Sequence, residues 1–227
     1  MGRTRLHDDA TAAALLDAAE KIAETKGLQA LTVRRVAEKT GTTTRAVYTS
    51  LGSKQALLSG LGVRAFDMLG AMADRLPLTS DPAADLVAAG TLGFRPFALN
   101  HPALFQIGIQ QTSVPSDVAQ AIIPAAERAL VALHRRIARL RDADRIGART
   151  IPDAAWEFHA ACEGLAALEL RCIIPPEDGR RLWDDTLSAL VAGWQHVTPA
   201  RHPPETPGNS RQPGHAGSQP HHDPSRR

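Results

Sequence analysis

The sequence predicts an all-α protein, with an N-terminal three-helix domain containing a helix-turn-helix and a larger helical domain after it. Composition gives the first reason: 43% of the residues are hydrophobic but only 4% are aromatic, which favours alanine- and leucine-rich helices over a sandwich or barrel. The second is that apolar residues recur at spacings of three and four, the period of an amphipathic helix. The third is that Gly, Pro, Ser and Thr stand at the ends of these periodic stretches, where helices start and stop.

Three short helices are predicted in the N-terminal domain. Residues 10–26 form the first, and Gly27 ends it as glycine does after a helix C-terminus. The second begins after Thr32, a suitable N-cap, and ends at Gly41. The third covers 43–51, so a tight glycine-containing turn joins it to the second, as in a helix-turn-helix.

The larger domain is divided by its prolines and glycines. Ser53 is a suitable N-cap for the helix that opens it. The predicted helices are 54–76, one from Pro82 that kinks at Pro96, one from Pro102, 124–142, 152–172 and 176–198.

Changes in composition predict three parts: a helix-turn-helix domain over 1–58, a helical domain over 59–198 and a tail over 199–227. The tail is rich in Pro, Gly, Ser and His and has no apolar periodicity, so it is predicted to be disordered. Its histidines are interpreted as solvated polar residues rather than metal ligands. No metal site and no cofactor are predicted anywhere in the chain.

Cysteine usage and hydropathy predict a cytoplasmic protein. Cys162 and Cys172 are the only cysteines, and on one helix they would lie about 15 Å apart, too far for a disulfide. Both are expected to be buried thiols in a reducing compartment. We find no signal peptide pattern and no apolar stretch near the ~18–20 residues of a membrane span, so no membrane partner is expected.

Charge is distributed unevenly along the chain. Residues 27–60 contain five basic side chains and one acidic one, whereas residues 61–198 contain 13 basic and 16 acidic side chains. A basic module attached to an acidic body indicates a polyanionic partner for the first part alone.

The third predicted helix has two chemically different faces. On a wheel of about 100° per residue, Thr44, Arg45, Tyr48 and Thr49 share one arc. The opposite arc holds Ala46, Val47, Ser50 and Leu51. One face can pack on the first two helices while the other presents a guanidinium, a phenol and hydroxyls, which suits a helix in the major groove of DNA.

Neighbouring residues extend this polar face. Lys54 at the start of the fourth helix, and Thr32 at the start of the second, lie where free backbone amides attract phosphate. The candidate DNA-binding residues are Thr32, Arg34, Thr43, Thr44, Arg45, Tyr48, Thr49 and Lys54. The alternative is a small helical hairpin with a solvated polar face, which the combination of caps, turn and charge disfavours.

The stretch Leu31–Leu58, LTVRRVAEKTGTTTRAVYTSLGSKQALL, resembles the DNA-binding domain of the tetracycline-repressor (TetR) family. The resemblance implies a homodimeric, all-helical transcriptional regulator whose C-terminal domain binds a small molecule. It implies phosphate contacts for Thr32, Thr43, Tyr48 and Lys54. It implies base contacts for Arg34, Thr44, Arg45 and Thr49.

Two positions depart from the family pattern. Ser50-Leu51 stands where the family usually has His-Phe, so a phosphate-binding histidine is missing or replaced by the Ser50 hydroxyl. Thr42 replaces an aliphatic residue. Both are expected to weaken affinity or change the tilt of the recognition helix.

Part of the C-terminal domain resembles a class of this family with a Trp and a His-Gly signature. The similar segments are Phe94–Ile109, Trp156 and Glu163–Leu170, with Glu163 in place of the usual His. The candidate ligand-binding residues are Phe94, Phe97, His101, Phe105, Trp156, His159 and Glu163. Ordinary core packing is the alternative for each of them.

Two apolar stripes on the last two predicted helices suggest a four-helix dimer interface. The candidate interface residues are Leu165, Leu168, Trp183, Leu187, Leu190, Val191 and Trp194. The alternative is an intramolecular core. A solvated helix face is the interpretation for Arg135, Arg136, Arg139 and Arg141.

These observations favour a sequence-specific transcriptional repressor that a small-molecule effector releases from a palindromic double-stranded DNA operator. An enzyme is disfavoured, because no nucleophile elbow, phosphate loop or zinc spacing occurs. The other alternative is a helical interaction module with weakened DNA binding, motivated by Ser50 and Thr42.

Overall fold

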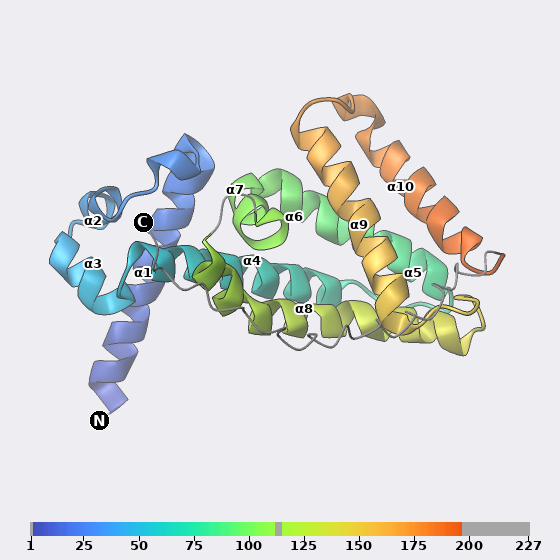
Figure 1. Cartoon of the computed structure of the whole chain (residues 1–227), viewed down its shortest axis with the longest axis horizontal. Helices are drawn as coiled ribbons and strands as arrows, with labels where there is room; N and C mark the ends of the chain where they lie inside the picture. Colours follow the sequence, from blue (N-terminus) through green and yellow to red (C-terminus); the bar gives the residue numbers. More distant parts are fainter. Residues whose placement is uncertain (1, 112–114, 197–227) are drawn as a thin grey trace, which may run out of the picture.

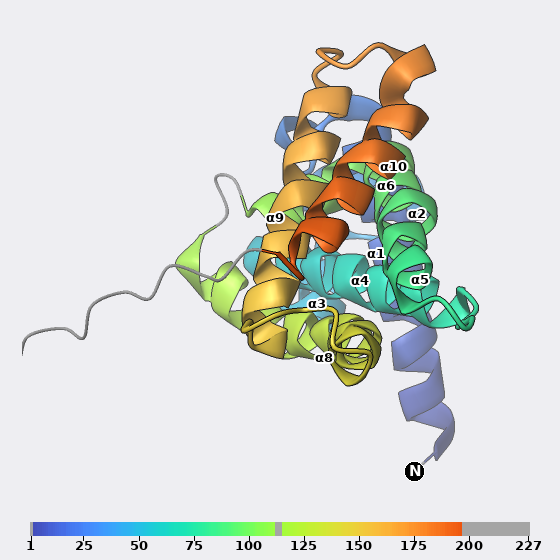
Figure 2. The same cartoon turned by 90° about the vertical axis from the view of Figure 1, so that its right-hand side faces the viewer.

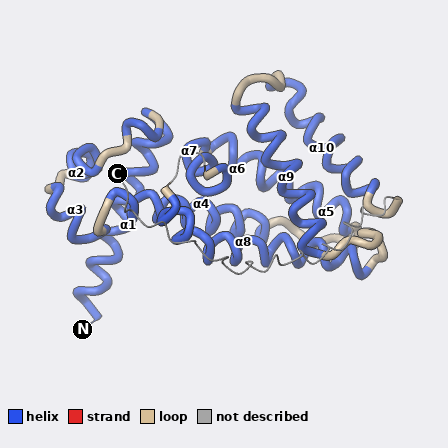
Figure 3. Tube along the Cα trace, viewed as in Figure 1, coloured by secondary structure: helices blue, strands red, loops and turns tan. Residues whose placement is uncertain are grey.

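The computed structural model describes residues 2–111 and 115–196, and every regular element within those ranges is a helix (Figure 1, Figure 3). This confirms the predicted all-α class. The N-terminal helices form a small bundle at one end of the molecule, and the remaining helices form a larger body beside it (Figure 1). The predicted tail from residue 199 onward lies outside the described residues.

The small bundle is made of α1 (Gly2–Lys26), the 3-10 turn η1 (Leu28–Ala30), α2 (Val33–Thr40) and α3 (Thr44–Leu51). Local sequence sets its boundaries. Thr32 Oγ1 accepts the backbone N–H of Arg35 at 3.2 Å, and Thr43 Oγ1 accepts that of Ala46 at 3.2 Å, which satisfies amides at each helix start that have no partner within the helix. Gly41 has φ 67°, the left-handed conformation that turns the chain from α2 into α3.

Helix α4 (Lys54–Arg75) runs from the small bundle into the body and packs along α8 (Ser116–Asp142) (Figure 1). It passes without a break through the predicted domain boundary at residues 58 and 59. Helix α8 begins eight residues before its predicted start, so the prediction at Pro124 was wrong. A proline inside a helix removes one backbone hydrogen bond, and its ring clashes with the carbonyl four residues earlier. In α8 the packing along α4 offsets this cost, so the helix continues through Pro124.

A continuous helical rod follows α4: α5 (Pro82–Ala88), the π-helical segment η2 (Ala89–Phe94) and α6 (Arg95–Asn100). The irregular turn precedes Pro96, where a kink was predicted. The chain then turns at His101 into α7 (Pro102–Leu104) and a second π-helical segment, η3 (Phe105–Gln110). Such π segments are uncommon and frequently lie at functional sites.

The last two helices, α9 (Ile151–Leu170) and α10 (Pro176–Gly193), lie side by side as an antiparallel pair (Figure 2). Two arginine–glutamate–tryptophan networks hold the pair together. Glu169 accepts Arg95 at 2.6 Å and the Trp183 indole N–H at 3.0 Å. A matching arrangement near the other end of the pair has Glu157 accepting Arg149 at 2.9 Å and the Trp194 indole N–H at 2.7 Å. Each carboxylate therefore joins its two partners and fixes α9 against α10.

Two smaller expectations need correction. Cys172 is exposed in the turn after α9 rather than buried, whereas Cys162 is buried as predicted. By length and composition alone, α4 is the one helix in the described parts of the chain that is long and apolar enough to cross a membrane. Leu57, Leu61 and Ala65 on this helix are buried against the rest of the protein.

Candidate nucleic-acid interface and ligand cavity

Helix α3 places its polar arc on the surface. Thr44, Arg45, Tyr48 and Thr49 are all exposed, and the Tyr48 side chain is 53% exposed. Val47 on the opposite arc is only 2% exposed and belongs to the core that α1, α2 and α3 share. More than half of the Tyr48 phenol is exposed on the same face as the Arg45 guanidinium, so this arc is available to a partner.

The flanking candidates lie around the same surface. Thr32 and Thr43 are exposed N-caps of α2 and α3, and Lys54 is the exposed first residue of α4, behind the Ser53 cap. Arg34 is exposed and pairs with Glu38 at 2.9 Å, a surface pair weak enough to exchange for a phosphate or base.

Ser50, the departure from the family pattern, lies on the side of α3 that faces α1. It is half-buried and lines an open groove together with Thr11, Ala12 and Arg45. The same groove is lined by Arg45 and Thr49 of the exposed arc, so Ser50 lies between α1 and that arc.

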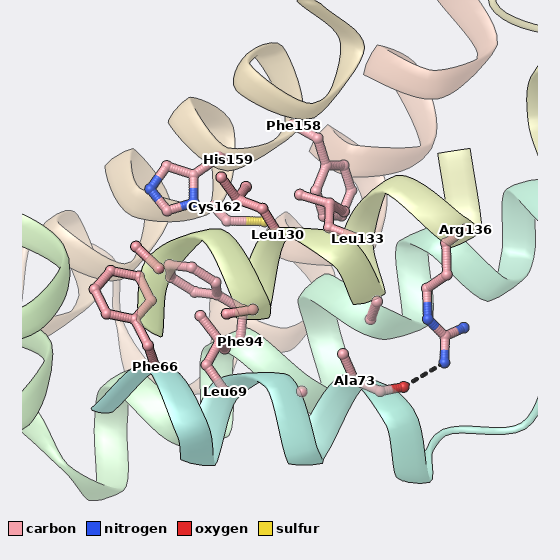
Figure 4. A pocket seen from close by; sticks show the side chains of 14 residues that line it. Phe66, Leu69, Ala73, Phe94, Leu130, Leu133, Arg136, Phe158, His159 and Cys162 are labelled. Atoms are coloured by element: carbon pink, nitrogen blue, oxygen red, sulfur yellow. Dashed lines mark hydrogen bonds between the residues drawn. The ribbon is translucent and has the colours of Figure 1, made fainter. Parts of the chain in front are cut away.

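The larger body contains a narrow apolar cavity of about 70 Å³ between α4, η2, α8 and α9 (Figure 4). Its lining residues are Phe66, Leu69, Ala73, Ala89, Gly93, Phe94, Ala126, Ala129, Leu130, Leu133, Arg136, Phe158, His159 and Cys162. For comparison, an engineered cavity of about 150 Å³ holds one benzene. In this conformation the cavity is therefore smaller than one that holds a single benzene.

The structure brings two of the predicted ligand residues, Phe94 and His159, to this cavity. The remaining five lie elsewhere. Phe97 and Phe105 are fully buried in the core, and Trp156 is 60% exposed on the outside of α9. His101 stacks on Phe97 at the end of α6, and Glu163 lies half-exposed beside His159, with Nε2 and Oε2 3.6 Å apart.

Burial shifts the pKa values of the cavity's histidine and thiol toward their uncharged forms. Burial lowers the pKa of His159, and burial raises the pKa of the Cys162 thiol. A protonated thiol is a poor nucleophile, so Cys162 contributes surface to the cavity and no covalent chemistry. His159 contacts the rings of Phe94 and Trp156 edge-on, with centroids 5.7 and 5.8 Å away.

Sequence analysis missed Arg136, which was interpreted as solvated. The residue is only 3% exposed. Its Nη1 donates to the carbonyl of Asp85 at 3.2 Å, and its Nη2 donates to those of Ala73 and Leu76 at 2.6 and 2.7 Å. The available signal was spacing, because position 136 lies three residues after Leu133 on the apolar stripe of α8.

Arg139 also differs from the solvated interpretation. Its guanidinium pairs with the buried carboxylate of Asp85, which the Thr79 hydroxyl and backbone N–H also contact at 2.8 Å. Burial raises the pKa of Asp85, but hydrogen bonds from Arg139 and Thr79 outweigh it and the pKa is lowered overall. Arg135 and Arg141 are exposed as expected and pair with Asp74 and Asp142.

Most of the predicted dimer residues pack inside one protomer. The side chains that are at most 9% exposed are Leu165, Trp183, Leu187, Val191 and Trp194. Leu168 and Leu190 are half-buried against the same core. Apolar spacing alone does not distinguish a stripe that packs on the body of its own chain from one that packs on a second copy.

Carboxylates of α1 connect the small bundle to the body. Glu24 accepts the backbone N–H groups of Ala103 and Leu104 at 3.0 and 3.1 Å, so it caps α7 from another part of the chain. Glu20 accepts Arg64 of α4 at 2.7 Å and lies 3.4 Å from His101 Nδ1. The helical rod of α5, η2 and α6 contributes η2 to the cavity wall. Its C-terminal end, at His101, is therefore attached directly to α1.

Comparisons with known proteins match both parts of the chain. Residues 15–61 match the family model described as bacterial regulatory proteins, tetR family, and residues 86–190 match the model for a tetracyclin repressor-like C-terminal domain. No match was found among curated proteins.

Several solved structures share the fold. A protein of unknown function from Rhodococcus sp. RHA1 is 22% identical, with a TM-score of 0.72 over 81% of this chain and 95% of that one. The regulator PfmR from Thermus thermophilus is 18% identical, with a TM-score of 0.58 over 78% and 96%. FadR from Bacillus subtilis, solved with stearoyl-CoA, is 14% identical, with a TM-score of 0.65 over 79% and 97%.

At these identities the solved structures establish the fold alone, whereas the two family models cover the helix-turn-helix and most of the body. The family consists of DNA-binding transcription factors and not of enzymes. The exposed polar arc of α3 agrees with that role, and the chain belongs to the TetR family of transcriptional regulators.

Proposed function

We propose that this protein is a homodimeric repressor that binds a palindromic operator through α3 and leaves it when an organic effector enters the cavity. The observation that carries the proposal is the exposed arc of Thr44, Arg45, Tyr48 and Thr49 on a helix whose other face is buried. A helix with one buried apolar face and one exposed polar face is suited to the major groove.

The residues divide into base readers and phosphate anchors. Arg45 is the candidate for a guanine contact, worth about 1–3 kcal/mol of discrimination, and Thr44, Thr49 and Arg34 lie beside it. Thr32, Thr43 and Lys54 at three helix starts hold phosphates with their backbone amides or charge. The Tyr48 hydroxyl donates a hydrogen bond to a phosphate oxygen. Together these phosphate contacts fix the position of α3, and Arg45 distinguishes the base sequence.

The dimer forms through the outward faces of α9 and α10, on the side opposite the buried stripe. On α9 this face presents Trp156, Ala160 and Gly164, and on α10 it presents Thr186 and Ala189, all exposed in the protomer. Small residues permit close helix approach, and an exposed tryptophan is characteristic of an interface. A second copy seated there gives a four-helix bundle with two-fold symmetry.

The small size of the cavity provides a way to couple effector binding to DNA binding. A ligand larger than about 70 Å³ has to separate η2 and α9 from α4 and α8. Displacement of the η2–α6 rod moves His101 and the start of α7, which Glu20 and Glu24 tie to α1. The separation of the two α3 helices then no longer matches two half-sites, for a coupling of about 1–3 kcal/mol.

A promoter-binding assay with matched variants tests the proposal. We expect the full-length dimer to bind a fragment from its own genome with sequence preference, and Arg45→Ala with Tyr48→Ala to remove most of that affinity. Arg141→Ala is the control, because Arg141 is an exposed arginine on α8 paired with Asp142. Unchanged affinity and salt dependence in the double variant would show that α3 is not the DNA face, and the chain would then be the alternative interaction module.

A further inference from the structure

The body contains a buried cation that no carboxylate neutralises. Arg136 is in no ion pair among the described residues, although it is 3% exposed. Its nearest acidic neighbour, Asp85, gives its carboxylate to Arg139 and Thr79 and offers Arg136 only its main-chain carbonyl. Asp85, Arg136 and Arg139 together therefore carry one uncompensated positive charge.

Isolated buried charges are costly, so proteins pair them or hydrogen-bond them fully. The carbonyls of Ala73 and Leu76 lie at the C-terminus of α4, whose dipole supplies part of the missing negative charge. A guanidinium has five N–H donors, and Arg136 makes three hydrogen bonds, all to backbone carbonyls. Burial lowers the pKa of Arg136, although the nearby carboxylates of Asp85 and Asp74 act in the opposite direction.

This cation stands in the wall of the ligand cavity. Figure 4 shows Arg136 at one end and His159 at the other, with Leu69, Leu133 and Phe158 between them. The rest of the wall holds no charged side chain, because its other members are apolar apart from the thiol and the imidazole. The cavity wall is therefore apolar along most of its length and has its one charged residue, Arg136, at one end.

We propose that the effector is an amphipathic monocarboxylate, with its carboxylate against Arg136 and its apolar body extending toward Phe94 and His159. This inference rests on the proposed function, since it takes the cavity as the effector site. The carboxylate completes the hydrogen bonding of the guanidinium and neutralises it. The apolar wall excludes ligands with a second charge, because a charge buried there would have no partner.

The competing explanation is that Arg136 only caps the C-terminus of α4. The two explanations predict opposite preferences between a carboxylate and an alcohol of equal length. An apolar cavity without an available cation prefers an alcohol to a carboxylate of equal length, since the carboxylate loses more hydration. A cavity with an available cation prefers the carboxylate, because a charge-assisted hydrogen bond is stronger.

Calorimetric titration of the full-length dimer with n-octanoate and 1-octanol measures this preference. We expect octanoate to bind at least about tenfold more tightly. Equal binding of the two probes, tighter binding of the alcohol, or no binding of octanoate would overturn the proposal.

Matched variants locate the preference. Arg136→Gln should bring the octanoate-to-octanol ratio to one or below, and Arg136→Lys should retain part of it. Arg135→Gln is the control: it alters a neighbouring exposed arginine that pairs with Asp74 outside the cavity, and the ratio should stay at its wild-type value. A ratio that Arg136→Gln leaves unchanged contradicts the proposal. If that variant does not fold, the wild-type preference and the Arg136→Lys ratio decide.

Operator binding without ligand separates this inference from the proposed function. A protein that binds its promoter but shows no preference for octanoate keeps the repressor proposal and loses the carboxylate. A protein that prefers octanoate but binds no promoter keeps the carboxylate site and loses the repressor.

Discussion

The exposed polar arc of α3 and the cavity are built in opposite ways. All four residues of the α3 arc come from one helix of eight residues, and the caps that set its ends are its immediate neighbours. The cavity gathers side chains from Phe66 to Cys162, on four elements far apart in the chain. A surface made by one element can be changed one residue at a time, whereas each cavity residue also supports the packing around it.

This difference explains where sequence analysis succeeded. Thr32, Thr43 and Ser53 each cap a helix through an amide three residues later, an interaction contained within four residues of sequence. Arg136 bonds to Ala73, Leu76 and Asp85, which are 51 to 63 residues away. Local contacts are visible in sequence and distant ones are not.

The strongest test of the comparison concerns a residue predicted for the dimer interface but buried in the protomer. Leu187 is 0% exposed and packs over Gly90, whereas Leu78 is 51% exposed. We expect Leu187→Ala to lower the free energy of unfolding by about 2–5 kcal/mol and Leu78→Ala to change it by less than about 1 kcal/mol. Chemical denaturation at one fixed protomer concentration measures both, and equal effects would place Leu187 outside the core.

The outward face of α9 provides the second test. A Cβ on Gly164 meets no atom within 4 Å in the protomer, so Gly164→Arg should fold normally but prevent a second copy from approaching. Sedimentation should show a monomer, and operator affinity should fall roughly 100-fold or more because two half-sites no longer bind together. A dimer that persists in this variant would rule out the proposed face.

Acid should destabilise the body through the buried carboxylate of Asp85. The pKa of Asp85 in the folded protein is below its ordinary value of 3.8. Its stabilising contribution is therefore complete above pH 3.8 and is lost as the pH falls through the lower folded value. Asp85→Asn should lower the free energy of unfolding near neutral pH by about 1–2 kcal/mol, allowing for the partly exposed Arg139.

Unfolding curves across acidic pH, for wild type and Asp85→Asn, check this expectation. The variant should lose part of the acid dependence, so the two stabilities should converge as the pH falls. Parallel pH profiles would mean that Asp85 titrates normally in the folded protein.

The smallest expected effect belongs to a single phosphate contact. Lys54→Ala should weaken binding about three- to fivefold for every operator variant alike, and the salt slope should fall by about one. Arg45→Ala should instead flatten the preference at one base pair. Binding isotherms at several salt concentrations, on two operators differing at that base, distinguish the two roles.

The sequence by itself determined the helix starts, the turn at Gly41, the exposed arc of α3 and the family, because each depends on residues a few positions apart. The tertiary structure alone decided that Trp183 and Leu187 face inward, that Phe97 is core and that Arg136 lines a cavity. Helical periodicity shows that a face is apolar, but not which partner covers it. Whether an arginine on that face is solvated or buried depends on carbonyls brought to it from distant helices.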